Sequence, residues 1–371
     1  MSSSTSSDLP PRPNDLEMTI FGPGVGECIV LHLGNGDWII VDSCIFPDSS
    51  EPAALEYLRG FGVNPSTSVR RVVATHWHDD HIRGMASVLR ECSSAQFVMS
   101  GALASTQFIQ LVLEVDAQNK LVKYSSSASE FAEILDILKS RKSSRHAVGP
   151  HIYAQDGNRL FVGGYNNVAE VWALSPSSAT ITNAFAGLAE RLMTPGEVRR
   201  FKQFSPNDLS VAILVQTGAY HLLLGADLEN TPTEDFGWKA VLRSTLRPTV
   251  LSSAFKIAHH GSANAEHKDV WGTMLVDKPI AVVTPYAKLA EPLPTKPDLQ
   301  RIIDRASKAY CTTWPPSQRP TRRQGVDGVV RGATKSRRSL SRKGGYIRLR
   351  MDLSDSSAVP SVELFGSAKQ L

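Results

Sequence analysis

The sequence has few cysteines and no long hydrophobic run. Its 371 residues include four cysteines, at Cys28, Cys44, Cys92 and Cys311. They lie far apart without a Cys-x-x-Cys pair, which argues against a cysteine-zinc site and favours free thiols in a reducing, cytoplasmic location. No apolar run approaches the roughly 20 residues of a transmembrane helix, so we expect no membrane span. The first residues, MSSSTSSDLPPRPND, lack the basic and apolar regions of a signal peptide, and we predict a short disordered leader over residues 1–16.

The chain also has little net charge, but its basic residues are unevenly distributed. The formal net charge is +4, with 42% hydrophobic and 20% charged residues, which is typical of a globular protein. Residues 319–343 nevertheless contain nine lysines and arginines and one aspartate, and Arg337 and Arg338 are among them. Two interpretations stay open. The stretch is a solvated surface loop, or it is a basic arm that neutralises phosphates and makes nucleic-acid binding salt-dependent.

Hydrophobic patterning predicts one large domain over residues 17–371. Two β-branched runs, Cys28–Leu33 and Trp38–Val41, flank the turn sequence GNGD, which is the signal of a β-hairpin. Ala53–Gly60 has the pattern of a short helix. The apolar segment RRVVA that follows is typical of a buried strand and leads directly into a histidine cluster.

The rest of the chain alternates between predicted helices and strands. Apolar residues recur at helical spacing from Ile82 to Leu89, and Asp79 is the expected N-cap. Residues 101–165 mix helical stretches with serine-rich and basic patches, and we interpret them as an insertion or a lid. Strands grouped in two halves, each followed by helices, predict an α+β fold in which two mixed sheets pack face to face with helices on their outer faces.

The stretch THWHDDH, residues 75–81, is unusually dense in titratable side chains. Because buried unpaired ionisable groups are costly, an ordinary core does not collect them. His76 and His78 are two apart in an extended segment and point to the same side, so they can hold one cation. Asp80 and His81 begin the next helix facing the same space and can hold a second one. The alternative, a polar loop with incidental histidines, does not explain the H-x-H-x-D-H spacing.

This spacing resembles the defining motif of the metallo-β-lactamase-fold hydrolases, and the resemblance extends from about residue 17 to about residue 350. Within that superfamily the sequence looks most like the hydrolase domain of ComEC-type DNA-uptake proteins. The segments GVGECIVLHLGNGDWIIVDS, NDLSVAILVQTGAYHLLLGAD and FKIAHHGSANA carry this closer likeness. The resemblance implies an αββα sandwich and a hydrolase with two divalent metal ions, zinc being the first candidate.

The resemblance also implies metal ligands far along the chain. Asp227 stands where the family has a bridging carboxylate, although alone it would be a cap or turn residue. His259 and His260 follow the strand FKIA, and since adjacent strand residues point to opposite sides, we expect only one to bind metal. The Gly-His-Gly form seen elsewhere in the superfamily favours His260. His259 would then face the substrate, where it or a metal-bound water would protonate the leaving group.

The third histidine expected for the His76/His78 metal is missing from its usual place, where the sequence reads SPNDLS. The candidates for its replacement are water, Asn207, Asp208, His146, His151 and His221. An amide oxygen such as that of Asn207 suits Mn²⁺ or Mg²⁺ better than Zn²⁺, so the identity of this metal stays open.

Three further residues belong to the predicted site. Asp42 either orients a ligand histidine through its ring N–H or caps a strand end. Lys256 and Ser262 flank the histidine pair and could contact a phosphate, although Lys256 could equally be an exposed strand residue.

The predicted reaction is hydrolysis by a metal-activated water, with Asp80 and His259 beside the reacting atoms. We predict a phosphodiesterase that acts on nucleic acid, with DNA as the first candidate. The alternatives are a hydrolase of small phosphodiesters, such as cyclic nucleotides or choline-phosphate esters, and a non-catalytic metal-binding fold in a complex. A ComEC-type domain without its membrane channel suggests a cytoplasmic effector in defence against foreign DNA, with or without a protein partner or activator.

Overall fold

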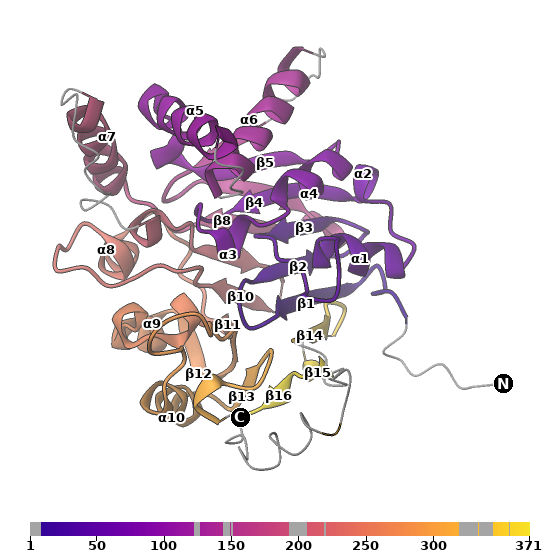
Figure 1. Cartoon of the computed structure of the whole chain (residues 1–371). Helices are drawn as coiled ribbons and strands as arrows, with labels where there is room; N and C mark the ends of the chain where they lie inside the picture. Colours follow the sequence, from indigo (N-terminus) through magenta and orange to yellow (C-terminus); the bar gives the residue numbers. More distant parts are fainter. Residues whose placement is uncertain are drawn as a thin grey trace.

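Two β-sheets form the centre of the molecule in a computed structural model, which describes residues 9–121, 127–143, 149, 151–192, 206–218, 220–318, 333, 344–355 and 357–371 (Figure 1). In spatial order, the described strands of the first sheet are β15 (Ser361–Gly366), β14 (Gly345–Asp352), β1 (Asp15–Gly22), β2 (Cys28–His32), β3 (Trp38–Val41), β4 (Val69–Ala74), β5 (Gln96–Ser100) and β6 (His151–Ala154). Those of the second sheet are β16 (Lys369–Gln370), β13 (Lys308–Cys311), β12 (Leu275–Val283), β11 (Ser252–Lys256), β10 (His221–Leu224), β9 (Ile213–Gln216), β8 (Ala169–Ala173) and β7 (Arg159–Gly163).

Both sheets are mixed, as predicted. Strands β3 to β6 run parallel in the first sheet, and β10 to β13 run parallel in the second. The remaining pairs are antiparallel. Because parallel strands all end on the same side, each sheet has one edge where loops and helix starts gather beyond the carboxyl ends of its strands.

The predicted hairpin joins β2 to β3. Its central residues Asn35 and Gly36 have φ values of 52° and 76°, and the Leu33 N–H donates to Asp37 O at 2.9 Å. Two consecutive positive φ values define a turn whose twist matches that of the flanking strands. The turn fixes the register, which pairs Leu31 with Ile39 across the two strands.

Alternate residues of both sheets fill the space between them. Met18, Leu31 and Ile39 of the first sheet meet Ile213 and Leu222 of the second, and all five are completely buried. Because strand side chains point alternately to opposite faces, the remaining residues of these strands face outward toward the helices.

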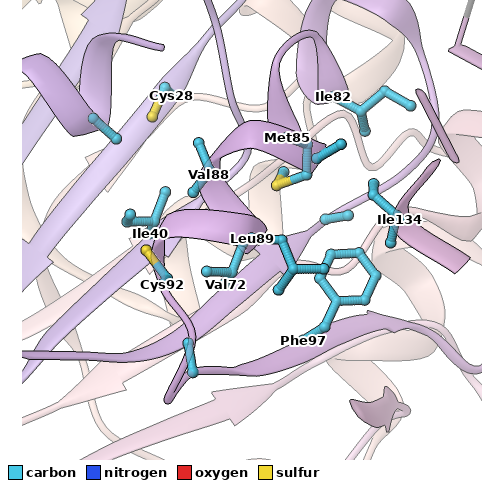
Figure 2. Close-up of a cluster of buried hydrophobic side chains, with 14 of the residues drawn as sticks. Cys28, Ile40, Val72, Ile82, Met85, Val88, Leu89, Cys92, Phe97 and Ile134 are labelled. Atoms are coloured by element: carbon cyan, nitrogen blue, oxygen red, sulfur yellow. The ribbon is translucent and has the colours of Figure 1, made fainter. Parts of the chain in front are cut away.

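Helices cover the outer face of the first sheet (Figure 1). They are α1 (Ala53–Gly60), α2 (Pro65–Ser68), α3 (Asp79–Ile82), α4 (Met85–Glu91), α5 (Thr106–Leu121) and α6 (Ser127–Ser143). Figure 2 shows Met85, Val88 and Leu89 of α4 lying over Val72 and Phe97 of the sheet. The helical spacing read from the sequence is thus confirmed.

The predicted N-cap of this helix is wrong. Asp79 lies inside the short helix α3, whose N-cap position is His78. Helix α4 is separate and has Gly84 as its N-cap, with φ of 83°. A residue in this left-handed conformation cannot continue a helix, so the chain breaks here and starts a new one.

The segment predicted as an insertion or lid over residues 101–165 is part of the fold. Phe108 of α5 and Phe131 and Ile134 of α6 are buried in the same apolar cluster as α4. The strands β6 and β7 that follow form the edges of the first and second sheets respectively. Both strands are short, and β6 is mostly half-buried without alternation, so the sequence gives little periodic signal for them.

The second sheet has its own outer layer, made of α8 (Gly237–Arg243), α9 (Lys268–Thr273) and α10 (Lys296–Arg305), whereas α7 (Ser178–Leu192) lies near α5.

Strand β1 begins at Asp15, inside the predicted leader, and residues 1–8 lie outside the described residues. Strands β15 and β16 follow β14, which contains the segment GYIRLRM. None of the described helices has the length and apolar character needed to cross a membrane.

Candidate metal centre

The predicted site residues come together where parallel strands of both sheets end. The stretch 75–81 follows β4, Asp227 follows β10, and His259 and His260 follow β11. Gly225 brings the last two loops together, since a Cβ at this position would lie 2.7 Å from that of Ala258. The His259 N–H also donates to the carbonyl of Ala226 at 2.9 Å. The loop that carries Asp227 and the turn that carries His259 and His260 therefore meet by close packing of strand ends.

Six side chains form two groups that share Asp227. The first group is Asp80, His81, Asp227 and His260, and the second is His76, His78 and Asp227; within each group the potential ligand atoms lie within 4.8 Å of one another. Asp227 Oδ2 lies 3.6 Å from His260 Nε2 and 3.9 Å from His76 Nε2. His76 Nε2 lies 3.1 Å from His78 Nδ1. Sharing one carboxylate between the groups is the arrangement expected for a two-metal site.

Asp42 fixes the orientation of His81. Its Oδ2 lies 2.7 Å from His81 Nδ1 and accepts a hydrogen bond from the Thr75 hydroxyl at 2.8 Å. Its Oδ1 accepts the backbone N–H of Thr75 at 2.8 Å. Because its Nδ1–H donates a hydrogen bond to Asp42, His81 presents Nε2 to the shared carboxylate, and this contact favours the orienting role of Asp42 over the strand-end cap.

His260 is held in a similar way by backbone. Its Nδ1 donates to the carbonyl of Thr284 at 2.9 Å, and its Nε2 lies 3.2 Å from Asp80 Oδ2. His259 lies outside both groups, so the structure places His260 in the cluster, as the resemblance favoured. The reason differs from the predicted strand alternation, because β11 ends at Lys256 and the two histidines lie in a 3₁₀ turn.

The backbone around the site is strained. Several non-glycine residues here have positive φ values, namely Asp42 at 59°, Ala226 at 46°, His259 at 44° and His260 at 53°. Such conformations cost about 1–3 kcal/mol each and persist only where the surrounding structure holds them. Arg301 provides one such restraint, because its Nη2 donates to the carbonyl of Gly261 at 2.8 Å.

The electrostatics of the site favour a cation. Burial lowers the pKa of His81, but Asp227 and Asp80 outweigh it and raise this pKa well above its ordinary value. Burial raises the pKa of Asp227, but His81 and His260 hold it well below its ordinary value. The pKa of His76 falls well below its ordinary value, chiefly because the ring is buried. Buried carboxylates that hold a proton on a neighbouring imidazole create the negative potential that attracts metal ions.

The side chains present fit divalent metal ions. Two buried atoms at the centre, His81 Nε2 and Asp227 Oδ1, make no hydrogen bond within the described part of the chain, although they lie 3.4 Å apart. Buried polar atoms are almost always satisfied, so this pair calls for a partner that lies between them. Imidazole nitrogen and carboxylate oxygen are ligands of zinc and manganese alike, so the donor set does not choose between these metals.

The prediction that Lys256 contacts a phosphate is wrong. Its side chain is completely buried and forms an ion pair with Glu27, which is itself buried. The same carboxylate of Glu27 accepts the hydroxyl of Thr284 at 2.6 Å. The pair joins the loop between β1 and β2 to the end of β11, and so holds the two sheets together beneath the metal centre.

His259 belongs to a polar network above the metal centre. Its Nδ1 lies 3.1 Å from Glu229 Oε1 and 3.1 Å from Asn264 Oδ1. The side-chain amide of Asn207 donates to the same oxygen, Glu229 Oε1, at 2.6 Å, and its nitrogen lies 3.3 Å from His259 Nε2. Asn207 is thus in the cleft, as predicted, and its part in binding a metal stays a prediction.

The remaining predicted contacts lie elsewhere. Ser262 lines a separate cavity of about 20 Å³ behind the histidine turn, so it does not face the metal centre. Arg337 and Arg338, with nearly all of the basic segment 319–343, lie outside the described residues. The open cleft over the metal centre has a volume of about 440 Å³ and is lined by His78, Asp227, His259 and His260 among others.

Sequence reasoning missed two carboxylates of the site. Glu27 follows the glycine-rich turn GPGVG, and its Oε1 lies 4.0 Å from His81 Nδ1. Glu229 stands two residues after Asp227, and that proximity was the available signal for it. No spacing rule identifies Glu27, because its partners, Lys256 at the end of β11 and Thr284 just after β12, are more than 200 residues away in the sequence.

Comparisons with known proteins agree with this geometry. Residues 21–106 match the family model described as the metallo-beta-lactamase superfamily, and the match includes the whole THWHDDH stretch. No curated protein matches the chain.

Similar solved structures include the metallo-beta-lactamase fold protein YhfI from Bacillus subtilis, at 12% identity and a TM-score of 0.39, covering 79% of this chain and 95% of that one. A metallo-beta-lactamase from Cronobacter sakazakii is 15% identical with a TM-score of 0.35, covering 72% of this chain and 82% of that one. The sandwich of two mixed sheets, the histidine motif at their edge and the match of residues 21–106 to the superfamily model together show that the chain has a metallo-β-lactamase fold.

Proposed function

We propose that the chain is a metal-dependent phosphodiesterase that cleaves nucleic acid, with DNA as the substrate. The observation that carries the proposal is the pair of His/Asp groups joined at Asp227. The proposed ligands are Asp80, His81, Asp227 and His260 for one ion, and His76, His78 and Asp227 for the other. Divalent ions bound at such a site lower the pKa of water toward neutrality and polarise the oxygen of the electrophile.

The other residues of the cleft position the substrate and the leaving group. Glu229 and Asn264 hold Nδ1 of His259, so its Nε2 is directed toward Asn207 and the cleft. In this orientation His259 is the proposed donor of a proton to the leaving oxygen. Asp42 keeps His81 in the tautomer that leaves Nε2 available to a metal.

The nucleic-acid substrate is supported by the sequence. The nine basic residues of segment 319–343 suit phosphate neutralisation, and three segments resemble the hydrolase domain of ComEC-type DNA-uptake proteins. A cytoplasmic role in defence against foreign DNA, alone or with a protein partner, extends the same resemblance.

The test is incubation of plasmid DNA with the full chain in Mn²⁺, Mg²⁺ or Zn²⁺, beside the Asp80→Ala/His81→Ala double variant. Cleavage by the wild type and not by the double variant is expected. Lys308→Gln is the matched control, because this exposed lysine begins β13 at the end of the sheet opposite the site, and it should cleave like the wild type. Hydrolysis of bis-p-nitrophenyl phosphate without any cleavage of DNA would instead favour a small phosphodiester as substrate. Absence of both activities with every metal would overturn the proposal.

A further inference from the structure

A second cavity opens beside the metal centre, and we propose that it binds one nucleoside of the phosphodiester substrate together with the phosphate that follows the scissile one. The proposal rests on the proposed function and names the part of the substrate that the enzyme recognises. The cavity has a volume of about 270 Å³. Residues from both halves of the chain line it, between the loop at Val25, the start of α6 at Ser127 and the loop at Lys288.

The cavity adjoins the metal cleft. Asp79, Asp80, Ser127 and Tyr286 line both the cavity of about 270 Å³ and the cleft of about 440 Å³. Asp80 belongs to the metal cluster, so a substrate whose reacting phosphate lies there can extend past Asp80 and Tyr286 into the cavity. A substrate with nothing beyond the scissile phosphate would leave the cavity empty.

The floor of the cavity is apolar and its walls are tied together. Val25, Cys44, Ile45 and Ile82 form the apolar part. The backbone N–H of Ala287, in the loop after β12, donates to the carbonyl of Gly24 at 2.9 Å. The backbone N–H of Glu27 donates to the carbonyl of Asp80 at 2.9 Å. A preformed apolar pocket of this kind suits a base or sugar, since binding does not have to order its walls.

The size of the cavity limits what it accepts. Its 270 Å³ falls just below the roughly 300–1,000 Å³ of ordinary ligand pockets, so it has room for one compact group and not for a base pair. The ring of Tyr286 stands at its junction with the cleft, stacked on His260 with the ring centroids 5.1 Å apart. Aromatic side chains in such positions bind unpaired bases without regard to sequence. A single-stranded substrate therefore fits the cavity.

Two cations at the rim supply the contact for a second phosphate. Arg83 follows α3, and Lys288 lies in the loop after β12, so they approach the cavity from the two sheets. Both side chains are exposed, and neither forms an ion pair with any side chain that the structure describes. The nearby carboxylate of Glu130 is engaged by the backbone N–H of Ala86 at 2.7 Å. The two cations are therefore available for an anion of the substrate.

Three chromogenic substrates test the assignment with the metal-loaded enzyme. Methyl p-nitrophenyl phosphate has no nucleoside, thymidine 5′-p-nitrophenyl phosphate has one, and its 3′-phosphorylated form adds a second phosphate. We expect kcat/KM to rise at least tenfold at each step. Val25→Trp, which fills the cavity, should reduce kcat/KM at least tenfold more for the two nucleoside substrates than for the methyl ester. Arg83→Gln and Lys288→Gln should remove most of the gain from the second phosphate, whereas Lys308→Gln should keep it.

A binding measurement separates failure of this assignment from failure of the proposed function. If all three substrates are hydrolysed with equal kcat/KM, the phosphodiesterase stands and the nucleoside site is overturned. If none is hydrolysed, titration calorimetry with thymidine 3′,5′-bisphosphate decides the matter. Binding that weakens at least fivefold in Arg83→Gln and not in Lys308→Gln supports the site. Absence of binding, or equal binding by both variants, overturns it.

Discussion

Replacing Lys256 by methionine should destabilise the protein severely, because it leaves the Glu27 carboxylate buried without its counter-charge. Lys256 and Glu27 have exposed side-chain fractions of 0% and 1%. After the substitution, the carboxylate keeps the hydroxyl of Thr284 at 2.6 Å, and the nearest imidazole, that of His81, lies 4.0 Å away and is already bonded to Asp42. Removing one partner of a buried ion pair costs about 3–5 kcal/mol, and we expect a loss of that size in the free energy of unfolding.

The double variant Glu27→Gln/Lys256→Met isolates the interaction between the two charges. Glu27→Gln alone strands the ammonium and should also cost about 3–5 kcal/mol. With both charges gone, what remains is the loss of hydrogen bonds, at about 1 kcal/mol each. We therefore expect the double variant to lie within about 2 kcal/mol of the wild type, with a coupling energy of at least about 3 kcal/mol.

Urea unfolding in EDTA measures these differences without a contribution from bound metal. Tryptophan fluorescence and far-UV circular dichroism should give coincident transitions, which tests the two-state assumption. Lys308→Met is the matched control and should change stability by less than about 0.5 kcal/mol, since its side chain is exposed. A cost below about 1 kcal/mol for Lys256→Met, or additive single variants, would refute the buried pair.

Three other substitutions give further tests. Asp42→Asn removes the carboxylate that orients His81 and should weaken metal binding about 10–100-fold by calorimetry, whereas an unchanged Kd would exclude the orienting role. Arg301→Gln loses the bond to the carbonyl of Gly261 and should lower the metal content of the purified protein with the circular dichroism spectrum retained; full metal content would contradict this restraint. Burial lowers the pKa of His32, so the unfolded chain binds more protons below about pH 6.5 and stability is lost as pH falls through that value. His32→Asn should flatten this part of the stability curve, and parallel curves for the two proteins would disprove it.

Local patterns predict the parts of the fold that depend on neighbours in sequence. The hairpin at Asn35–Gly36 follows from two residues that tolerate positive φ, and the buried face of α4 follows from its spacing of apolar residues. The first half of the metal centre is equally local, because His76, His78 and His81 lie within one strand-to-helix connection. Short edge strands such as β6 lack such a signal, since their pairing partners supply the reason for their conformation.

Contacts between distant segments could not be predicted from the sequence. Lys256 looked like a strand residue free to meet a phosphate, and only the fold brings Glu27 from the opposite end of the chain to bury it. Likewise, Glu229 contacts His259, which lies in a turn with left-handed backbone where the sequence predicted a strand. Lys256 meets its partner through the packing of the two sheets, whereas Glu229 meets His259 because the loops after β10 and β11 lie side by side in one sheet.

Metal stoichiometry tests the central claim most directly. Purified protein dialysed against Zn²⁺ or Mn²⁺ should hold two ions per chain by inductively coupled plasma mass spectrometry, one for each His/Asp group. His78→Ala should hold one, because it damages a single group, whereas Asp227→Ala should lose both, because Asp227 belongs to each. A wild type that binds no ion, or an Asp227→Ala variant that binds as many as the wild type, would contradict the two-metal centre.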